Sequence, residues 1–184
     1  MKKIIAISLI VLCFMSCTYK SITYKYTFLS DPKKDINKRI SVRMRIPSDY
    51  VYTTSFATWE NIDYYTYPDS SVIYVTNYDI CNPNDENIKS LGDTIWSFRF
   101  QRAMYNQLLY TELGLGHMIP KYEKLQGKNS NGLYWRDILI EDTLSHLGQG
   151  VSFGYINVSK EKKNTYDKII ETAKFKMKTI RKRR

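Results

Sequence analysis

Hydrophobic and polar residues alternate along Arg39–Ile46, where every even position is Ile, Val or Met. A period of two places alternate side chains on one face of a strand, so this segment predicts an antiparallel strand with one buried face. Pro47 ends the strand, because proline has no backbone N–H to donate to a neighbouring strand. The other face carries three cations that either bind an anion or are simply solvated: Arg39, Arg43 and Arg45.

Tyrosine and β-branched residues predict further strands. They fill Ser71–Tyr78, and strands are also expected at Leu133–Ile140 and Val151–Val158. Asn61–Tyr67 precedes the first of these segments, and the Pro-Asp-Ser sequence at residues 68–70 favours a turn between them. These features predict a β-hairpin. A further strand is expected around Lys121–Leu125, before the turn sequence Asn-Ser-Asn-Gly at residues 129–132.

The spacing of apolar residues becomes helical at two places. We expect one helix over Arg102–Leu113, ended by Gly114, and a final helix with Asn164 as its N-cap. The final helix carries one apolar stripe that must lie on the sheet: Tyr166, Ile169, Ile170, Ala173 and Met177. The predicted fold class is therefore α+β, an antiparallel sheet with a C-terminal helix packed on one face.

The N-terminus has the pattern of an export signal. Two lysines precede an apolar run over residues 4–15, which is shorter than the roughly 20 residues that a membrane-spanning helix needs. The run ends in Leu-Cys-Phe-Met-Ser-Cys at residues 12–17, which resembles the lipobox of bacterial lipoproteins. The resemblance implies cleavage between Ser16 and Cys17, followed by lipid attachment to Cys17, with palmitate among the acyl chains. Three chains would hold the protein durably in the membrane, whereas one holds only marginally.

The lipobox resemblance implies an address and a domain organisation. We expect a protein of the bacterial cell envelope, anchored through Cys17 in the outer membrane and facing the periplasm. Residues 1–16 are then the lipoprotein signal peptide, 17–38 the lipidated cysteine and a tether, 39–180 a single α+β domain, and 181–184 a basic tail. Within the tether, Ser21–Leu29 has the composition of an edge strand.

The net charge of +10 suggests a nucleic-acid partner until the charges are mapped. Residues 31–173 contain 17 basic and 18 acidic side chains, so the excess belongs to the two ends of the chain. That distribution and an exported location argue against a nucleic-acid partner. The C-terminal cations either complement a helix dipole or contact an anionic surface, such as phospholipid headgroups or an acidic polymer. The proposed contact residues are Lys178, Arg181, Lys182, Arg183 and Arg184.

Signals for catalysis or metal binding are weak. The only histidines, His117 and His146, lack the spacing of zinc ligands, and Cys81 is the one thiol left after export and lipidation. Asp142, Ser145 and His146 lie close in sequence but without a nucleophile elbow. We therefore predict no catalytic residue, no metal ligand and no cofactor. An enzyme acting on a cell-wall polymer would need a buried, interacting pair of carboxylates.

Seven tyrosines cluster in the first half of the expected domain, where they suit either sugar or peptide recognition or half-buried strands. They are Tyr50, Tyr52, Tyr64, Tyr65, Tyr67, Tyr74 and Tyr78. The order of elements resembles that of Mog1/PsbP-like α/β sandwiches. The shared features are Ile46-Pro47, the hairpin at Tyr67–Tyr74, and Gly154-Tyr155 before a terminal helix. The resemblance implies an α/β/α sandwich with an adaptor or assembly role and no shared catalytic site.

These observations lead to one expected function and two alternatives. We expect a non-catalytic protein that binds or scaffolds an envelope protein or a cell-wall polymer. The first alternative is a carrier or sensor of a small ligand in a Tyr-lined cleft. An enzyme acting on the cell wall is the less favoured alternative.

Overall fold

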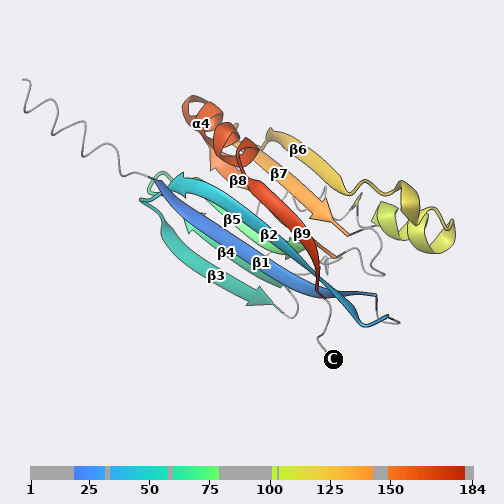
Figure 1. Ribbon diagram of the computed structural model, residues 1–184. Helices are drawn as coiled ribbons and strands as arrows, with labels where there is room; N and C mark the ends of the chain where they lie inside the picture. Colours follow the sequence, from blue (N-terminus) through green and yellow to red (C-terminus); the bar gives the residue numbers. More distant parts are fainter. Residues whose placement is uncertain are drawn as a thin grey trace, which may run out of the picture.

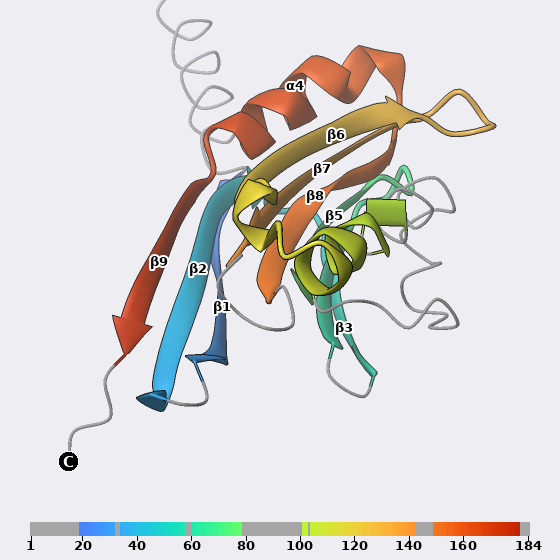
Figure 2. The ribbon, with the colours of Figure 1, turned by 90° about the vertical axis from the view of Figure 1, so that its right-hand side faces the viewer.

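Two antiparallel sheets lie against each other as two layers (Figures 1 and 2). The computed structural model describes residues 19–31, 34–57, 60–78, 101–102, 104–142 and 149–180. Within these ranges the smaller sheet has the strand order β1-β2-β9 and the larger sheet the order β3-β4-β5-β8-β7-β6. The smaller sheet is built from β1 (Tyr19–Asp31), β2 (Ile36–Pro47) and β9 (Lys174–Ile180).

The larger sheet contains the predicted hairpin, which joins its second and third strands along the chain. Tyr67 N donates to Ser71 O at 2.9 Å across the turn that joins β4 to β5. The strands of this sheet are β3 (Val51–Ala57), β4 (Glu60–Thr66), β5 (Val72–Tyr78), β6 (Tyr122–Lys128), β7 (Tyr134–Glu141) and β8 (Gly150–Val158). Residues 101–102 and 104–107 are α-helical and lead into the π-helical turn η2 (Leu108–Glu112), and the 3-10 turn η3 (Gly116–Met118) follows.

The core lies between the two sheets. Every even position of β2 from Ile40 to Ile46 is at most 2 % exposed, as the alternation in the sequence predicts. These side chains meet those of the larger sheet, among them Ile73, Val151 and Phe153, in one apolar cluster. Burying each such aliphatic or aromatic side chain stabilises the fold by about 1.5–3 kcal/mol. The contact between the sheets therefore supplies most of the apolar burial.

Helix α4 (Lys160–Glu171) follows β8 and lies across one end of both layers (Figure 2). Its buried residues Tyr166, Ile169 and Ile170 join the core between the sheets. Polar contacts hold the helix to the larger sheet: Arg136 on β7 donates from one nitrogen to Asp167 Oδ1 and Glu171 Oε1, both at 3.0 Å. These contacts turn Asp167 and Glu171, two of the three acidic side chains of the helix, toward β7 and away from the smaller sheet.

The predicted antiparallel strands with a C-terminal helix packed on them are confirmed, but the described residues are mostly β, with few helices, and form two sheets where the sequence predicts one. Arg39–Ile46 belongs to the smaller sheet, whereas the other three predicted strands lie in the larger one. One sheet was expected because the period-two pattern reports a buried face without saying what covers it. The buried face of β2 is covered by a second sheet as well as by the helix.

Two expectations at the chain ends need correction. The segment that the sequence assigns to a tether forms strand β1 from Tyr19 onward and pairs along its length with β2. The composition of the segment predicts a strand only over Ser21–Leu29. The final helix starts at Lys160 with Ser159 as its N-cap and ends at Glu171, not beyond Met177. Lys174–Ile180 forms strand β9, because Lys alternates there with apolar residues at a period of two.

The packing of α4 generates a testable prediction. Ile170 is 1 % exposed, so Ile170→Asp would place a charge in the core and remove apolar contacts. We expect the free energy of unfolding to fall by about 3 kcal/mol or more, measured by urea denaturation. Asn164→Asp on the exposed side of the same helix is the control and should change it by about 0.5 kcal/mol at most. An unchanged unfolding midpoint for Ile170→Asp would contradict this packing.

Candidate anion-binding surface

The outward face of the smaller sheet gathers cations from both ends of the chain. Residues directly paired in antiparallel strands point to the same side of the sheet. Arg43 pairs with Lys174, and Arg39 pairs with Lys178, on the side opposite the buried residues of β2. Seven residues make up what we call the cationic face: Lys25, Arg39, Arg43, Arg45, Lys174, Lys176 and Lys178.

Short hydroxyl side chains separate the cations on this face. The outward positions of β1 and β2 include Ser21, Thr23, Thr27 and Ser41. Arg39 Nε donates to Thr27 Oγ1 at 3.0 Å, so one guanidinium is already oriented across the sheet. Ser and Thr leave the longer Lys and Arg side chains projecting beyond them, and their hydroxyls can donate to an anion.

The electrostatics of this face are unfavourable in isolation. Along the described strands β1, β2 and β9, the four rows of outward residues that carry cations hold no carboxylate. Arg43 lies directly opposite Lys174, and Arg39 opposite Lys178, which places like charges in adjacent positions. Such pairs are destabilising, by up to about 1 kcal/mol each. An anion bound on this face would relieve that repulsion, which is the physical reason for regarding it as a site.

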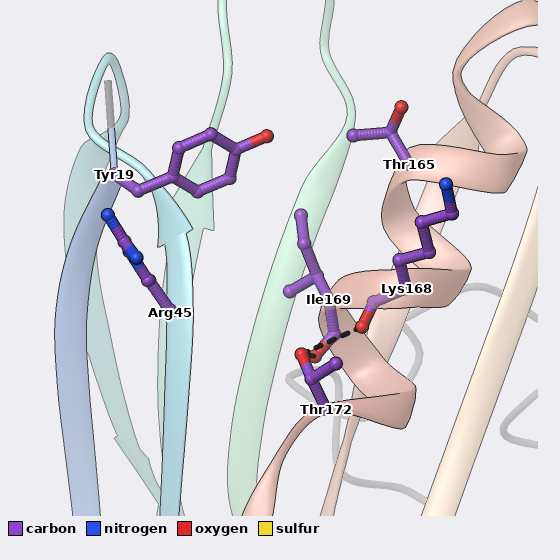
Figure 3. Close-up of a pocket in the computed structure, with 6 residues that line it drawn as sticks. All are labelled: Tyr19, Arg45, Thr165, Lys168, Ile169 and Thr172. Atoms are coloured by element: carbon purple, nitrogen blue, oxygen red, sulfur yellow. Dashed lines mark hydrogen bonds between the residues drawn. The ribbon is translucent and has the colours of Figure 1, made fainter. Parts of the chain in front are cut away.

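A pocket of about 560 Å³ adjoins the cationic face where β1 begins (Figure 3). It is lined by Tyr19, Arg45, Thr165, Lys168, Ile169 and Thr172, and we call it the Tyr19 pocket. Arg45 comes from β2 and Lys168 from α4, so the two cations stand on opposite walls, as Figure 3 shows. The Arg45 guanidinium also lies 5.8 Å from the centre of the Tyr19 ring, within cation–π distance.

Two acids of α4, Asp167 and Glu171, are turned away from the Tyr19 pocket. Asp167 accepts hydrogen bonds from Lys163, Tyr155 and Arg136. Burial opposes ionisation of this carboxyl, but those three donors outweigh it and hold its pKa below the usual range. Glu171 is likewise paired with Arg136. The face of α4 that lines the pocket therefore presents one lysine, two threonines and one isoleucine.

A second pocket of about 320 Å³ opens between β9 and the β6–β7 edge of the larger sheet. One wall is apolar, with the rings of Tyr122 and Phe175 stacked at 5.6 Å between centroids. Its lining also includes Glu141 and Asp142, which are 2 % and 3 % exposed. These neighbours are the buried carboxylates that an enzyme acting on a polymer would require, so their partners decide what they can do.

Each buried carboxylate has its own cation. Glu141 Oε2 accepts from Arg102 at 2.9 Å, and Asp142 Oδ1 accepts from Lys38 at 2.8 Å. Burial is the main cause that raises the pKa of Glu141, partly offset by Arg102. The two side chains point to different neighbours, because Asp142 also accepts from Ser30 at 2.6 Å while Glu141 faces the helical segment. They tie elements together and do not face a common substrate space as a catalytic pair would.

The tyrosines form part of the core more than they line a cleft. Tyr65, Tyr67 and Tyr74 are buried, and Tyr50 packs edge-on against Tyr65 at 5.0 Å between ring centroids. Tyr52 is exposed. Neither described pocket is lined by any of the seven tyrosines singled out in the sequence. Desolvation raises the pKa of the buried Tyr65 hydroxyl.

The structure places only some of the predicted site residues. Ser16, Cys17 and the tail residues Arg181, Lys182, Arg183 and Arg184 lie outside the described residues, as do Cys81, Ser145 and His146. Lys178 is an exposed residue of β9 on the cationic face. It lies there beside Arg39, which the sequence assigns to a separate cationic group, and the strand pairing adds Lys174 and Lys176 to the same surface.

No protein-family model, curated protein or solved structure matches this chain. Among the described residues, no helix is long and apolar enough to cross a membrane, and no cluster of His, Cys, Asp and Glu could hold a metal ion. A function for this protein therefore has to be argued from the geometry and charge of the surface itself.

The like-charge pairs predict an unusual response to neutralisation. Lys174→Gln removes the repulsion with Arg43, so we expect the melting temperature to rise by a few degrees at low salt. The gain should shrink at high salt, where the charges are screened. Lys128→Gln on β6 is the matched control and should not raise it. A lower melting temperature for Lys174→Gln at low salt would show that this cation stabilises the fold by other contacts.

Proposed function

We propose that this protein is a lipid-anchored envelope protein with a non-catalytic binding role, in which the cationic face holds an anionic partner. Cys17 carries the anchor and places the domain at the membrane, in the outer membrane facing the periplasm. The observation that carries the proposal is the position of the cationic face. Its seven cations lie on a sheet whose first residue, Tyr19, follows Cys17 by only two positions.

The same proposal accounts for the charge of the chain. Lysines 174–178 and the arginines of β2 contribute much of the net positive charge, and strand pairing concentrates them on one side. A catalytic role has less support, because both buried carboxylates at the second pocket are neutralised by cations. A Tyr-lined cleft also has less support, since the Tyr19 pocket contains a single tyrosine.

A relationship to Mog1/PsbP-like domains belongs to the proposal as well. It is supported by the Tyr67–Tyr74 hairpin and by Gly154-Tyr155 in β8, followed directly by α4. An adaptor or assembly role, as that resemblance implies, agrees with a binding surface that lacks catalytic groups.

The anchor is tested by Cys17→Ala. We expect this variant to lose incorporation of radiolabelled palmitate in cells and to remain an uncleaved precursor or appear in the soluble fraction. The physical reason is that no other thiol stands at the end of the apolar run after Ser16. Cys13→Ala and Cys81→Ala are matched controls and should be labelled like the wild type. Palmitate in Cys17→Ala would refute attachment at this residue.

The binding role is tested on a polyanion. Full-length protein in detergent should be retained on immobilised heparin and should elute at lower salt when Arg43, Lys174 and Lys176 are all changed to Gln. The control changes the exposed Lys121, Lys124 and Lys128 to Gln, which removes the same net charge from the β6 side of the molecule. Equal elution of the two triple variants would show that retention reflects net charge and not the cationic face.

A further inference from the structure

The short distance between the cationic face and the proposed anchor limits which anionic partners the face can reach. Tyr19 follows Cys17 by two residue steps, which span at most about 7 Å even when the chain is fully extended. The beginning of β1 and the Tyr19 pocket beside it are therefore held at the membrane surface, if Cys17 is the anchor.

The orientation of the smaller sheet decides how many cations reach the bilayer. Its charged rows run from Ser21 beside Arg45 to Thr27 beside Arg39, six residue steps that cover about 20 Å of strand. The Debye length at physiological salt is about 8 Å. A sheet standing on its end would keep only the Arg45 row within that distance. A sheet lying flat brings all seven cations within it, each contributing about 1 kcal/mol on an anionic surface.

The two ends of this face carry apolar side chains. Tyr19 at the start of β1 and Leu29 near its end fall on the outward side and are 42 % and 47 % exposed. Tyr19 and Leu29 would stay exposed to water if the face bound a soluble acidic polymer. A bilayer interface, in contrast, accommodates a tyrosine ring and an aliphatic side chain beside bound cations. The apolar ends thus favour a phospholipid surface over a polymer as the partner.

The Tyr19 pocket extends the same surface. Its two cations, Arg45 and Lys168, stand on opposite walls, and the hydroxyls of Thr165 and Thr172 lie beside Lys168 (Figure 3). Thr172 Oγ1 donates to the Lys168 carbonyl at 2.8 Å, which fixes that side chain at the helix end. Guanidinium and ammonium groups bind phosphate through charge-assisted hydrogen bonds. With a cation on each of two walls and a volume of about 560 Å³, the pocket suits a whole phospholipid headgroup.

We infer that the anchored domain lies flat on its membrane, with the cationic face on anionic phospholipid headgroups and one headgroup in the Tyr19 pocket. In this arrangement the larger sheet faces away from the bilayer. Because the anchor already confines the domain to the membrane, the contact needs only moderate electrostatic energy to set its orientation.

The test measures lysine reactivity in the full lipidated protein. The protein is reconstituted into vesicles of phosphatidylcholine with or without phosphatidylglycerol, exposed to an amine-acetylating reagent, and mapped by mass spectrometry. The reporters are Lys25, Lys174, Lys176 and Lys178 on the cationic face and Lys168 in the pocket, and the internal references are Lys124 and Lys128 on β6. We expect the reporters to react about fivefold more slowly than the references with phosphatidylglycerol, the factor that corresponds to 1 kcal/mol.

Controls separate the possible partners. Protection should be absent on pure phosphatidylcholine and should disappear in 1 M salt, where the Debye length is about 3 Å. Face lysines that react as fast as the references on phosphatidylglycerol vesicles would overturn the inference. So would protection that appears only when soluble polyglutamate is added, because the partner would then be an acidic polymer. Protected strand lysines beside a fully reactive Lys168 would overturn the headgroup site in the pocket.

A variant tests whether the charges themselves orient the domain. Arg43→Gln with Lys174→Gln should reduce the protection of Lys176 and Lys178 severalfold. The double variant leaves intact both Arg136, which is buried under α4, and the β6 lysines that serve as references. Lys121→Gln with Lys124→Gln is the matched control and should leave protection unchanged, with Lys128 as the remaining reference. Failure of the wild-type protein to stay with the vesicles would refute the anchor. Retention on the vesicles without protection would refute only the orientation.

Discussion

The antiparallel pairing of β9 with β2 is the contact on which the arrangement of this molecule depends. Seven residue pairs, from Arg43–Lys174 to Asn37–Ile180, join the last strand of the chain to the second. The pairing makes a three-stranded sheet out of the β1–β2 hairpin, and α4, which leads into β9, is drawn across the end of both layers. Without it the core residues of β2 would have a neighbouring strand on one side only.

The same pairing has an electrostatic cost. It sets Lys174 against Arg43 and Lys178 against Arg39, although polar uncharged residues would satisfy the outward positions equally well. The stability that offsets this repulsion comes from the buried side of the sheets, where Ile40 and Val42 meet the larger sheet and α4. Because repulsion on this face lowers the stability of the free protein, an anion that neutralises the face raises that stability. The packing of the core is in this way connected to the proposed binding role.

Elsewhere in the described structure, charges serve to fix elements in place. Arg136 joins β7 to α4 through two carboxylates, Lys162 joins the β4–β5 turn to α4 through Asp69, and Lys38 joins β2 to Asp142. Although burial opposes ionisation of Asp69, hydrogen bonds from Lys162 and Ser71 lower the pKa of its carboxyl to about 2. Arg136 and Lys162 are thus paired with acids, whereas no ion pair joins the outward cations of the smaller sheet to an acid among the described residues.

The sequence alone determined the local features whose signals are short in range. The alternation in β2, the turn at residues 68–70 and the apolar stripe of α4 could be read directly, because a period or a turn residue acts within a few positions. The resemblance of residues 12–17 to a lipobox is also local. The period-two alternation of Lys with apolar residues in β9 was present but was merged with the preceding helix, since Ala173 and Met177 also fit a helical spacing.

Only the tertiary structure decided which strands share a sheet and which charges share a surface. Those outcomes depend on pairing between segments more than 130 residues apart, such as Arg39 and Lys178, and no local pattern specifies the partner of a strand. For this reason the charge map along the chain shows two basic ends, while the folded protein shows one cationic face. The Tyr19 pocket likewise exists only because α4 is placed beside Arg45 by the strand that follows it.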